Sequence, residues 1–269
     1  MEAVVTAAFG LLGAAVGSFL NVCIDRLPVG QSLVGPPSYC DTCRRRLPPK
    51  DLIPLLSFLW LRRRCRYCGA LIRSRVFLVE VATALLFAFL YWHYGLTAQL
   101  GITAFYSCVF LVLLVIDLER QLILNKIVYP AAVVALLIGV FVLQTEAVAH
   151  APKLFLSQPA IVTRTLVGVT GGATGFILLL IPALLFRGGM GWGDVKMAGL
   201  IGLAVGFPLV FVAILGAMVA GGVVGGALLL FRIKDRKDPI PYGPFLSLAT
   251  MATLFYGNEI LDWYLRLFQ

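Results

Sequence analysis

The sequence contains few charged residues for its length. Only 13% of its 269 residues are charged, whereas 60% are hydrophobic, and a soluble domain is nearer a quarter charged. This shortage excludes a large soluble helical protein, because too few polar residues remain to cover so large an apolar core. A backbone in lipid must satisfy its own hydrogen bonds, so helices are expected. The chain is therefore predicted to be an all-α polytopic membrane protein.

Eight apolar runs define the predicted membrane spans, since a span needs roughly 20 mostly apolar residues. The sixth run is short and rich in glycine, so the count falls to seven if it merges with its neighbour. The first run has its basic flank after it, which favours a retained span over a cleaved signal peptide. The approximate bounds are 3–24, 76–94, 101–116, 127–143, 161–186, 195–206, 209–231 and 245–263.

Basic residues fall mainly on one side of this eight-span arrangement. Nineteen of the 22 Lys and Arg residues lie in loops on the same side as residues 25–75, which the positive-inside rule makes cytoplasmic. Contact with anionic membrane lipid then explains the net charge of +9, and no nucleic-acid partner is expected. We predict three parts: a first span (1–24), a cytoplasmic insert (25–75) and a membrane bundle (76–269).

The insert contains two C-x-x-C pairs, Cys40 with Cys43 and Cys65 with Cys68. Four thiolates about 2.3 Å from one ion form a closed structural Zn²⁺ site, and the flanking arginines offset its negative charge. Two disulfides or a redox pair are the alternatives. A cytoplasmic location is reducing, which argues against disulfides, so we predict structural zinc in an insert too small to have much core of its own.

Histidine is scarce as well, and His93 and His150 are both predicted on the external side. No Ser/His or Cys/His nucleophile is therefore visible. Acidic residues in or beside apolar runs are costly and indicate function; here they are Glu80, Asp117 and Asp194.

The two aspartates are predicted at one depth, near the cytoplasmic boundary of the membrane. Paired carboxylates can share a proton and activate water for hydrolysis without a covalent intermediate. Gly191 and Gly193 permit backbone shapes that let a loop pair with an extended substrate. The simpler alternative is a plain loop with Asp194 as the N-cap of the next helix.

Several segments together resemble the type 4 prepilin peptidase family, whose bifunctional members are also N-methyltransferases. They are Gly17-Ser-Phe-Leu-Asn-Val-Cys-Ile-Asp-Arg-Leu-Pro28, the two cysteine pairs, Asp117-Leu-Glu119, Gly191-Trp-Gly-Asp-Val-Lys196, a G-x-G-D site, and Pro241-Tyr-Gly-Pro-Phe245. The sequence departs from the family pattern in two places. Leu124-Asn125 stands where the family often has Pro before the acidic or amide residue, and Arg75-Val-Phe-Leu-Val-Glu80 stands where it often has Arg-Tyr-Pro-Leu-Val-Glu. The second departure concerns the methyltransferase activity.

The resemblance implies an intramembrane aspartyl protease of the bacterial inner membrane with Asp117 and Asp194 as catalytic residues. Gly191, Gly193 and Lys196 would support the catalytic loop. The substrates would be type IV prepilins and pseudopilins, cut after a Gly, for pili, type II secretion or DNA uptake. S-adenosylmethionine would be the methyl donor.

The same resemblance links Glu80 to substrate binding or methyl transfer; the alternative is an acid in the membrane that pairs with Arg73 or Arg75. The competing function is an ion- or proton-coupled transporter that uses the same aspartates. It leaves the four cysteines unexplained, and no repeat between chain halves supports it. A zinc-containing scaffold without catalysis is the third alternative.

Overall fold

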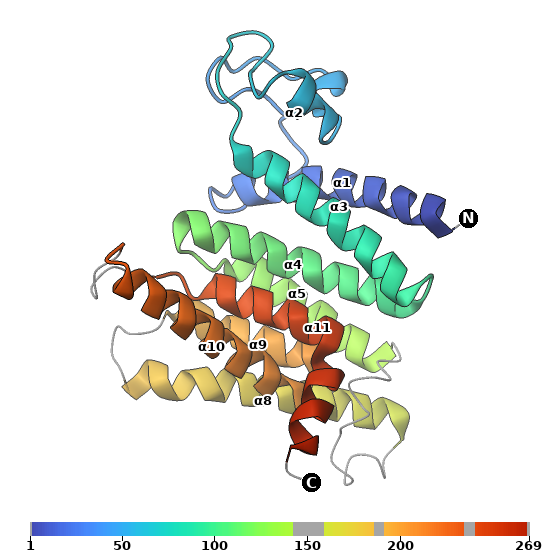
Figure 1. Cartoon of the computed structure of the whole chain (residues 1–269), viewed down its shortest axis with the longest axis vertical. Coiled ribbons are helices and arrows are strands. Elements are labelled where there is room, and N and C mark those ends of the chain that lie inside the picture. Colours follow the sequence, from blue (N-terminus) through green and yellow to red (C-terminus); the bar gives the residue numbers. More distant parts are fainter. Residues whose placement is uncertain (1, 142–158, 186–190, 234–239, 268–269) are drawn as a thin grey trace. The chain divides into compact units, whose positions relative to one another are not determined.

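A computed structural model describes residues 2–141, 159–185, 191–233 and 240–267 (Figure 1). Within these ranges the secondary structure is helical apart from two isolated bridges in the insert. The elements are α1 (Glu2–Arg26), η1 (Pro49–Leu52), α2 (Leu56–Trp60), α3 (Ser74–Tyr94), α4 (Ala98–Arg120), α5 (Asn125–Phe141), α8 (Ala160–Leu185), α9 (Trp192–Val205), α10 (Leu209–Leu230) and α11 (Gly243–Arg266).

Each of the eight predicted spans corresponds to a helix in the described part of the chain. Five of these helices, α1, α3, α4, α8 and α10, are long and apolar enough to cross a membrane. Of the other three, α5 is apolar but shorter, α9 has only 14 residues, and α11 is kinked at Tyr256. The predicted span ends at Leu143 and Phe186 lie outside the described residues.

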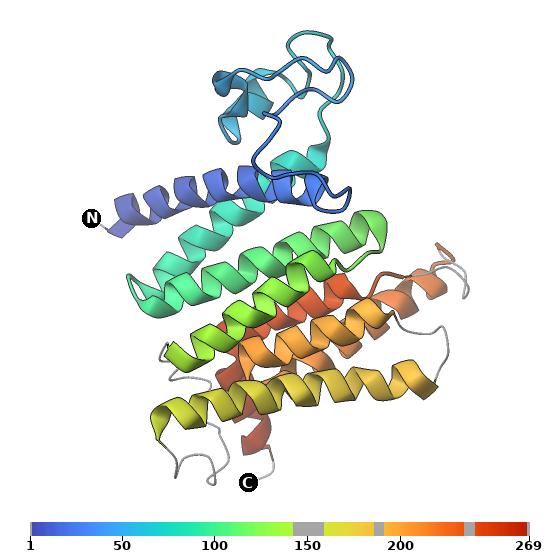
Figure 2. The same ribbon diagram turned by 180° about the vertical axis from the view of Figure 1, so that it is seen from behind.

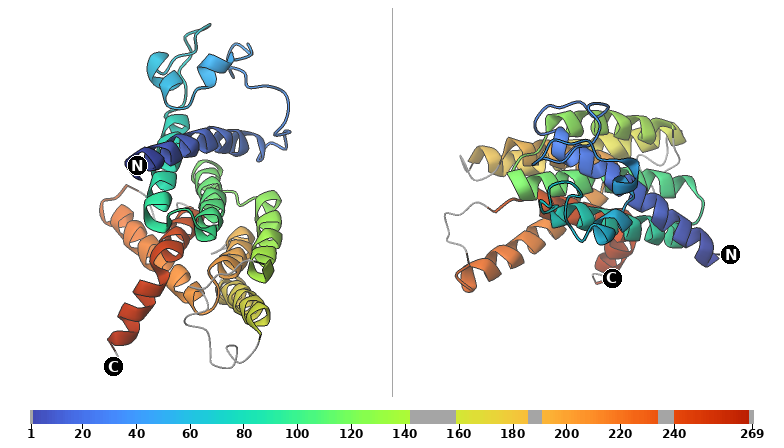
Figure 3. Two further views of the ribbon diagram at one scale, coloured as in Figure 1. Left: turned by 90° about the vertical axis from the view of Figure 1, so that its right-hand side faces the viewer. Right: turned by 90° about the horizontal axis from the view of Figure 1, so that it is seen from above.

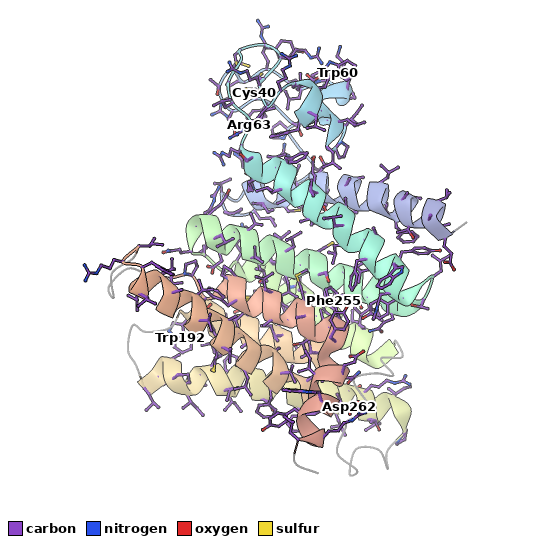
Figure 4. All side chains as sticks on the ribbon, viewed as in Figure 1. Cys40, Trp60, Arg63, Trp192, Phe255 and Asp262 are labelled. Atoms are coloured by element: carbon purple, nitrogen blue, oxygen red, sulfur yellow. The ribbon has the colours of Figure 1, made fainter. Side chains whose placement is uncertain are left out.

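The chain divides into two compact units, Met1–Ala104 and Phe105–Gln269. The three-part division that we predicted from the sequence, with the insert as a part of its own, stays a prediction. In the first unit α1 packs along α3, and η1 and α2 lie in the segment that joins them. Figure 4 labels Cys40, Trp60 and Arg63 in that segment.

The contact of α1 with α3 depends on three α1 residues spaced four apart, which places them on one helical face. Gly17 lies so close to α3 that an added Cβ would be 2.9 Å from Cα of Glu80. Asn21 donates a 3.0 Å hydrogen bond to the carbonyl of Val76, and Asp25 accepts one of 2.6 Å from Arg75. The first-span signature thus holds α3 in place.

The second unit is arranged around α9, which packs against α5, α8, α10 and α11. Figures 2 and 3 show α5, α9 and α8 as neighbours. Gly171 of α8 and Gly202 of α9 face each other so closely that a Cβ on either would overlap the other backbone. Close approach at small residues is typical of membrane helices, and it buries the short α9 among longer helices.

Candidate active site and metal centre

Asp117 lies in the last turn of α4 and is buried, with 5% of its surface exposed. Phe110 and Leu113, also buried, precede it by seven and four residues, so all three lie on one face of the helix. The sequence therefore directs a carboxylate into the interior of this unit. Oδ2 of Asp117 accepts a 3.0 Å hydrogen bond from the backbone N–H of Gly243.

Asp194 lies in the first turn of α9, which begins at Trp192 with Gly191 as its N-cap residue. The alternative in which Asp194 is itself the N-cap is therefore wrong. A Cβ on Gly191 would lie 3.2 Å from Oδ2 of Asp194, so the side chain folds back over the start of the helix. Figure 4 labels Trp192 at this helix start.

The two aspartates act on each other electrostatically, since the charge of Asp117 contributes to the environment of Asp194. They come from helices that are far apart in the sequence, and both lie in the second unit. Two carboxylates whose charges act on each other repel unless one of them holds a proton. The arrangement is therefore able to polarise a water molecule between an acid and a base.

The predicted loop-support residues contact the segment between α4 and α5. A Cβ on Gly193 would lie 2.8 Å from Cβ of Ile123, so only glycine fits there without displacement. Lys196 donates a 3.2 Å hydrogen bond to Oδ1 of Asn125 and lies 5.7 Å from the ring centre of Tyr129. These contacts fix the start of α9 against α5.

Two residues that the sequence did not identify as site residues also reach the aspartates. Gly243 is the hydrogen-bond donor to Asp117, and Tyr242 lies where the charge of Asp194 acts on its hydroxyl. Their signal in the sequence was the Pro241–Phe245 segment. It marked a turn, and a backbone N–H has no sequence signature that would have assigned it to the site.

The four predicted metal ligands come together in the first unit. The sulfurs of Cys40, Cys43, Cys65 and Cys68 all lie within 4.8 Å of one another, and those of Cys40 and Cys68 are 3.8 Å apart. Ligands about 2.3 Å from one tetrahedral ion are themselves about 3.8 Å apart, so the spacing fits a metal ion. All four are free thiols in the structure, as metal ligands would be.

The two cysteine pairs adopt the same local fold. Cys40 N–H bonds to the carbonyl of Arg45 and Arg44 N–H to that of Cys40; correspondingly, Cys65 N–H bonds to Ala70 and Gly69 N–H to Cys65. Arg44 and Gly69 both have positive φ. Backbone N–H groups of Cys43 and Thr42 lower the pKa of Cys40 to about 7, which favours the thiolate form that binds metal.

Glu80 lies in α3 and is buried, with 5% exposed. Its Oε2 accepts a 2.8 Å hydrogen bond from the N–H of Leu55, the N-cap residue of α2. Arg73 and Arg75 both pair with Asp25, so they are not the partners that the alternative reading gave to Glu80. The carboxylate therefore ties the insert to α3.

Comparisons with known proteins show which family the chain resembles. Residues 11–94 match the bacterial peptidase A24 N-terminal domain, and residues 104–226 match the type IV leader peptidase family. Relatives named prepilin leader peptidase/N-methyltransferase are 31% identical in Pseudomonas aeruginosa (95% of this chain and 92% of the relative covered) and 29% identical in Bacillus subtilis (96% of each). No solved structure matches.

The chain belongs to the type IV leader peptidase family. The N-terminal match includes the four cysteines and Glu80, and the family's peptidase match includes both aspartates. The peptidase match ends at residue 226, before Tyr242 and Gly243. The family models therefore cover Asp117 but not the residue of α11 that contacts it.

Proposed function

We propose that this chain removes the basic leader from type IV prepilins and pseudopilins by hydrolysis after a Gly. The observation that carries the proposal is that Asp117 and Asp194, which come from helices far apart in the sequence, lie in one unit where the charge of one acts on the other. Relatives over nearly the full length, named prepilin leader peptidase/N-methyltransferase, support the choice of substrate.

The mechanism follows from the pair. The ionised aspartate takes a proton from water, and the water oxygen forms a bond to the scissile carbonyl carbon. The protonated aspartate donates its proton to the carbonyl oxygen. When the C–N bond breaks, the leaving amine takes the proton that the pair holds. A hydroxyl of the tetrahedral intermediate gives its proton to the other carboxylate as the C=O bond forms again, which restores one proton shared between two carboxylates. The Gly243 N–H holds Asp117 in position throughout.

We also propose N-methylation of the new N-terminal residue, because the relatives bear that name. S-adenosylmethionine would supply an electrophilic methyl group to the freed amine. Glu80 is the candidate residue for this half, but its carboxylate is already held by Leu55.

Zinc is proposed for the four cysteines, as a structural ion that holds the insert. The sulfur spacing and the matching folds of the two pairs support a closed tetrahedral site. Such a small segment gains much of its folding free energy from the metal.

The proposed location is the bacterial inner membrane, with the insert and the aspartates toward the cytoplasm. The excess of Lys and Arg in residues 25–75 supports this orientation through the positive-inside rule. The basic leader of the substrate then remains cytoplasmic beside the aspartates, while the apolar part of the pilin lies in the membrane.

The test is cleavage of a purified prepilin in detergent by the wild type, Asp117→Ala and Asp194→Ala, with S-adenosylmethionine present and product masses measured. We expect the wild type to release the leader and the mature chain to gain the mass of one CH₂, because a methyl group replaces a hydrogen on the amine. Each variant should lose cleavage by at least about 10⁴-fold, as removal of catalytic groups does elsewhere. Cleavage by either variant would refute the two-aspartate mechanism, and an inactive, folded wild type would favour the transporter and call for ion-flux measurements.

A further inference from the structure

The turn before α11 lies against the aspartate pair. Residues 241 and 242 precede the helix, which begins at Gly243 with Pro244 in its first turn. Gly243 and Pro244 are buried. The proline fixes the backbone at the first turn of a helix, where its missing N–H costs nothing. The turn is therefore a rigid part of the site rather than a loose connection.

Gly243 contacts Asp117 so closely that no side chain fits at this position. An added Cβ would lie 2.6 Å from Oδ2 and 3.0 Å from Cγ of Asp117. The same closeness lets the Gly243 N–H donate its 3.0 Å hydrogen bond. Gly243 is thus a positioning residue, which sets where one oxygen of the Asp117 carboxylate lies.

Tyr242, the residue before Gly243, carries a buried hydroxyl on which the charge of Asp194 acts. Its oxygen is buried and has no hydrogen-bond partner among the described residues, although a buried Tyr hydroxyl usually has one. Its ring is held against α10, where a Cβ on Gly221 would lie 3.5 Å from Cε2 of Tyr242. A fixed and unused donor near a carboxylate is suited to a polar group that arrives with the substrate.

The hydroxyl is a donor at every pH at which the enzyme works. Burial raises the pKa of Tyr242 to about 12, and the negative charge of Asp194 contributes to the shift. It therefore keeps its proton while the aspartates exchange theirs.

We propose that Tyr242 is a third catalytic residue, whose hydroxyl donates a hydrogen bond to the scissile carbonyl oxygen, while Gly243 positions Asp117. The inference rests on the proposed peptidase activity. As the water oxygen bonds to the carbonyl carbon, the C=O π electrons move to the oxygen, which accepts the proton of the acid aspartate. Tyr242 keeps its own proton and stabilises the charge that develops on that oxygen.

The decisive variant is Tyr242→Phe, which removes only the hydroxyl. Loss of one such donor costs on the order of 10²-fold in kcat, so we expect that decrease with KM changed by less than about 2-fold. A substrate peptide with a hydroxyl-bearing tetrahedral carbon in place of the scissile carbonyl mimics the transition state. Its affinity for Tyr242→Phe should therefore fall, relative to the wild type, by the same factor as kcat/KM. If Tyr242 had only a structural role, the loss in kcat/KM and the loss in affinity for the mimic would not be equal.

The matched controls are Tyr256→Phe, an exposed tyrosine of the same helix, and Gly222→Ala on α10, where an added Cβ meets nothing within 4 Å. Both should cleave at the wild-type rate, whereas Gly243→Ala should not. Wild-type kcat in Tyr242→Phe would overturn the inference while leaving the peptidase intact. The inference would also be overturned if kcat fell in Tyr242→Phe while the transition-state mimic bound that variant as tightly as the wild type. Failure of the proposed function is distinguishable, since the wild type itself would then not cleave.

Discussion

At the scale of single residues, Cys65 is the most informative of the four cysteines. It is buried, and its own N–H and carbonyl both make the hydrogen bonds of the second pair. Replacement by serine keeps this backbone arrangement but substitutes a hydroxyl, which does not ionise as a thiol does, for a thiolate. We expect Cys65→Ser to lower the metal content from about one zinc per chain to well below one, as measured by elemental mass spectrometry.

The control for this prediction is Cys108→Ser, which changes a cysteine of α4 outside the four-sulfur cluster. It should retain wild-type metal content. A zinc content that falls equally in both variants would indicate general misfolding, and one that falls in neither would show that the cluster does not bind zinc.

The same scale shows how far side-chain chemistry could be predicted. Asp117 and Asp194 were identifiable because acidic residues are rare beside apolar runs, and the cysteines because their spacing is that of metal ligands. The hydrogen-bond partner of Asp117 could not be identified from the sequence, because Gly243 contributes only a backbone N–H. One partner of Glu80 was missed for the same reason, since it is the N–H of Leu55; the other is the side chain of Ser18.

At the scale of elements, Glu80 connects α3 to the start of α2. Leu55 has φ of 61°, an uncommon conformation for a residue with a side chain, and the hydrogen bond to Glu80 satisfies its N–H. Glu80→Ala should therefore loosen residues 52–60, with a cost of roughly 1–3 kcal/mol for the unsatisfied donor. Faster hydrogen–deuterium exchange in that segment measures the effect.

Glu80→Gln separates a structural role from a chemical one, because its amide oxygen can still accept from Leu55. We expect exchange in residues 52–60 and methyl transfer both to stay near wild type. If Gln preserves slow exchange but abolishes methyl transfer, the negative charge itself is required and Glu80 acts on the donor or the substrate. Glu2→Ala, an exposed change on α1, is the control.

Helices could be predicted from the sequence wherever a long apolar run indicates a membrane span. All eight runs became helices, because a backbone in lipid has few other ways to satisfy its hydrogen bonds. Helices α4 and α9 each begin three residues before the predicted apolar run, since helices extend into flanks such as Trp192–Asp194. The short η1 and α2 were not predicted, because a segment organised around metal ligands has no apolar periodicity to indicate them.

At the scale of the whole molecule, the distribution of Lys and Arg predicts the orientation of the chain in the membrane, which no single contact does. The structure contains no membrane, so the side on which the insert lies rests on the excess of Lys and Arg in residues 25–75. The sequence-based eight-span count adds a second expectation, in which α3 crosses the membrane once between the insert and the turn before α4. Those two segments must therefore lie on opposite sides.

Two single-cysteine additions test this orientation: Val34→Cys in the insert and Leu96→Cys between α3 and α4. Val34 is 97% exposed and Leu96 78% exposed, so neither change disturbs packing. With a membrane-impermeant maleimide and peptide mass mapping, we expect Leu96→Cys to be modified in right-side-out inner-membrane vesicles and Val34→Cys only in inverted ones. The reversed pattern would put the insert outside, where its thiols would oxidise and the basic leader of a precursor could not reach Asp117 and Asp194. Modification of both sites from one side would instead mean that α3 does not cross, and the eight-span arrangement would have to be abandoned.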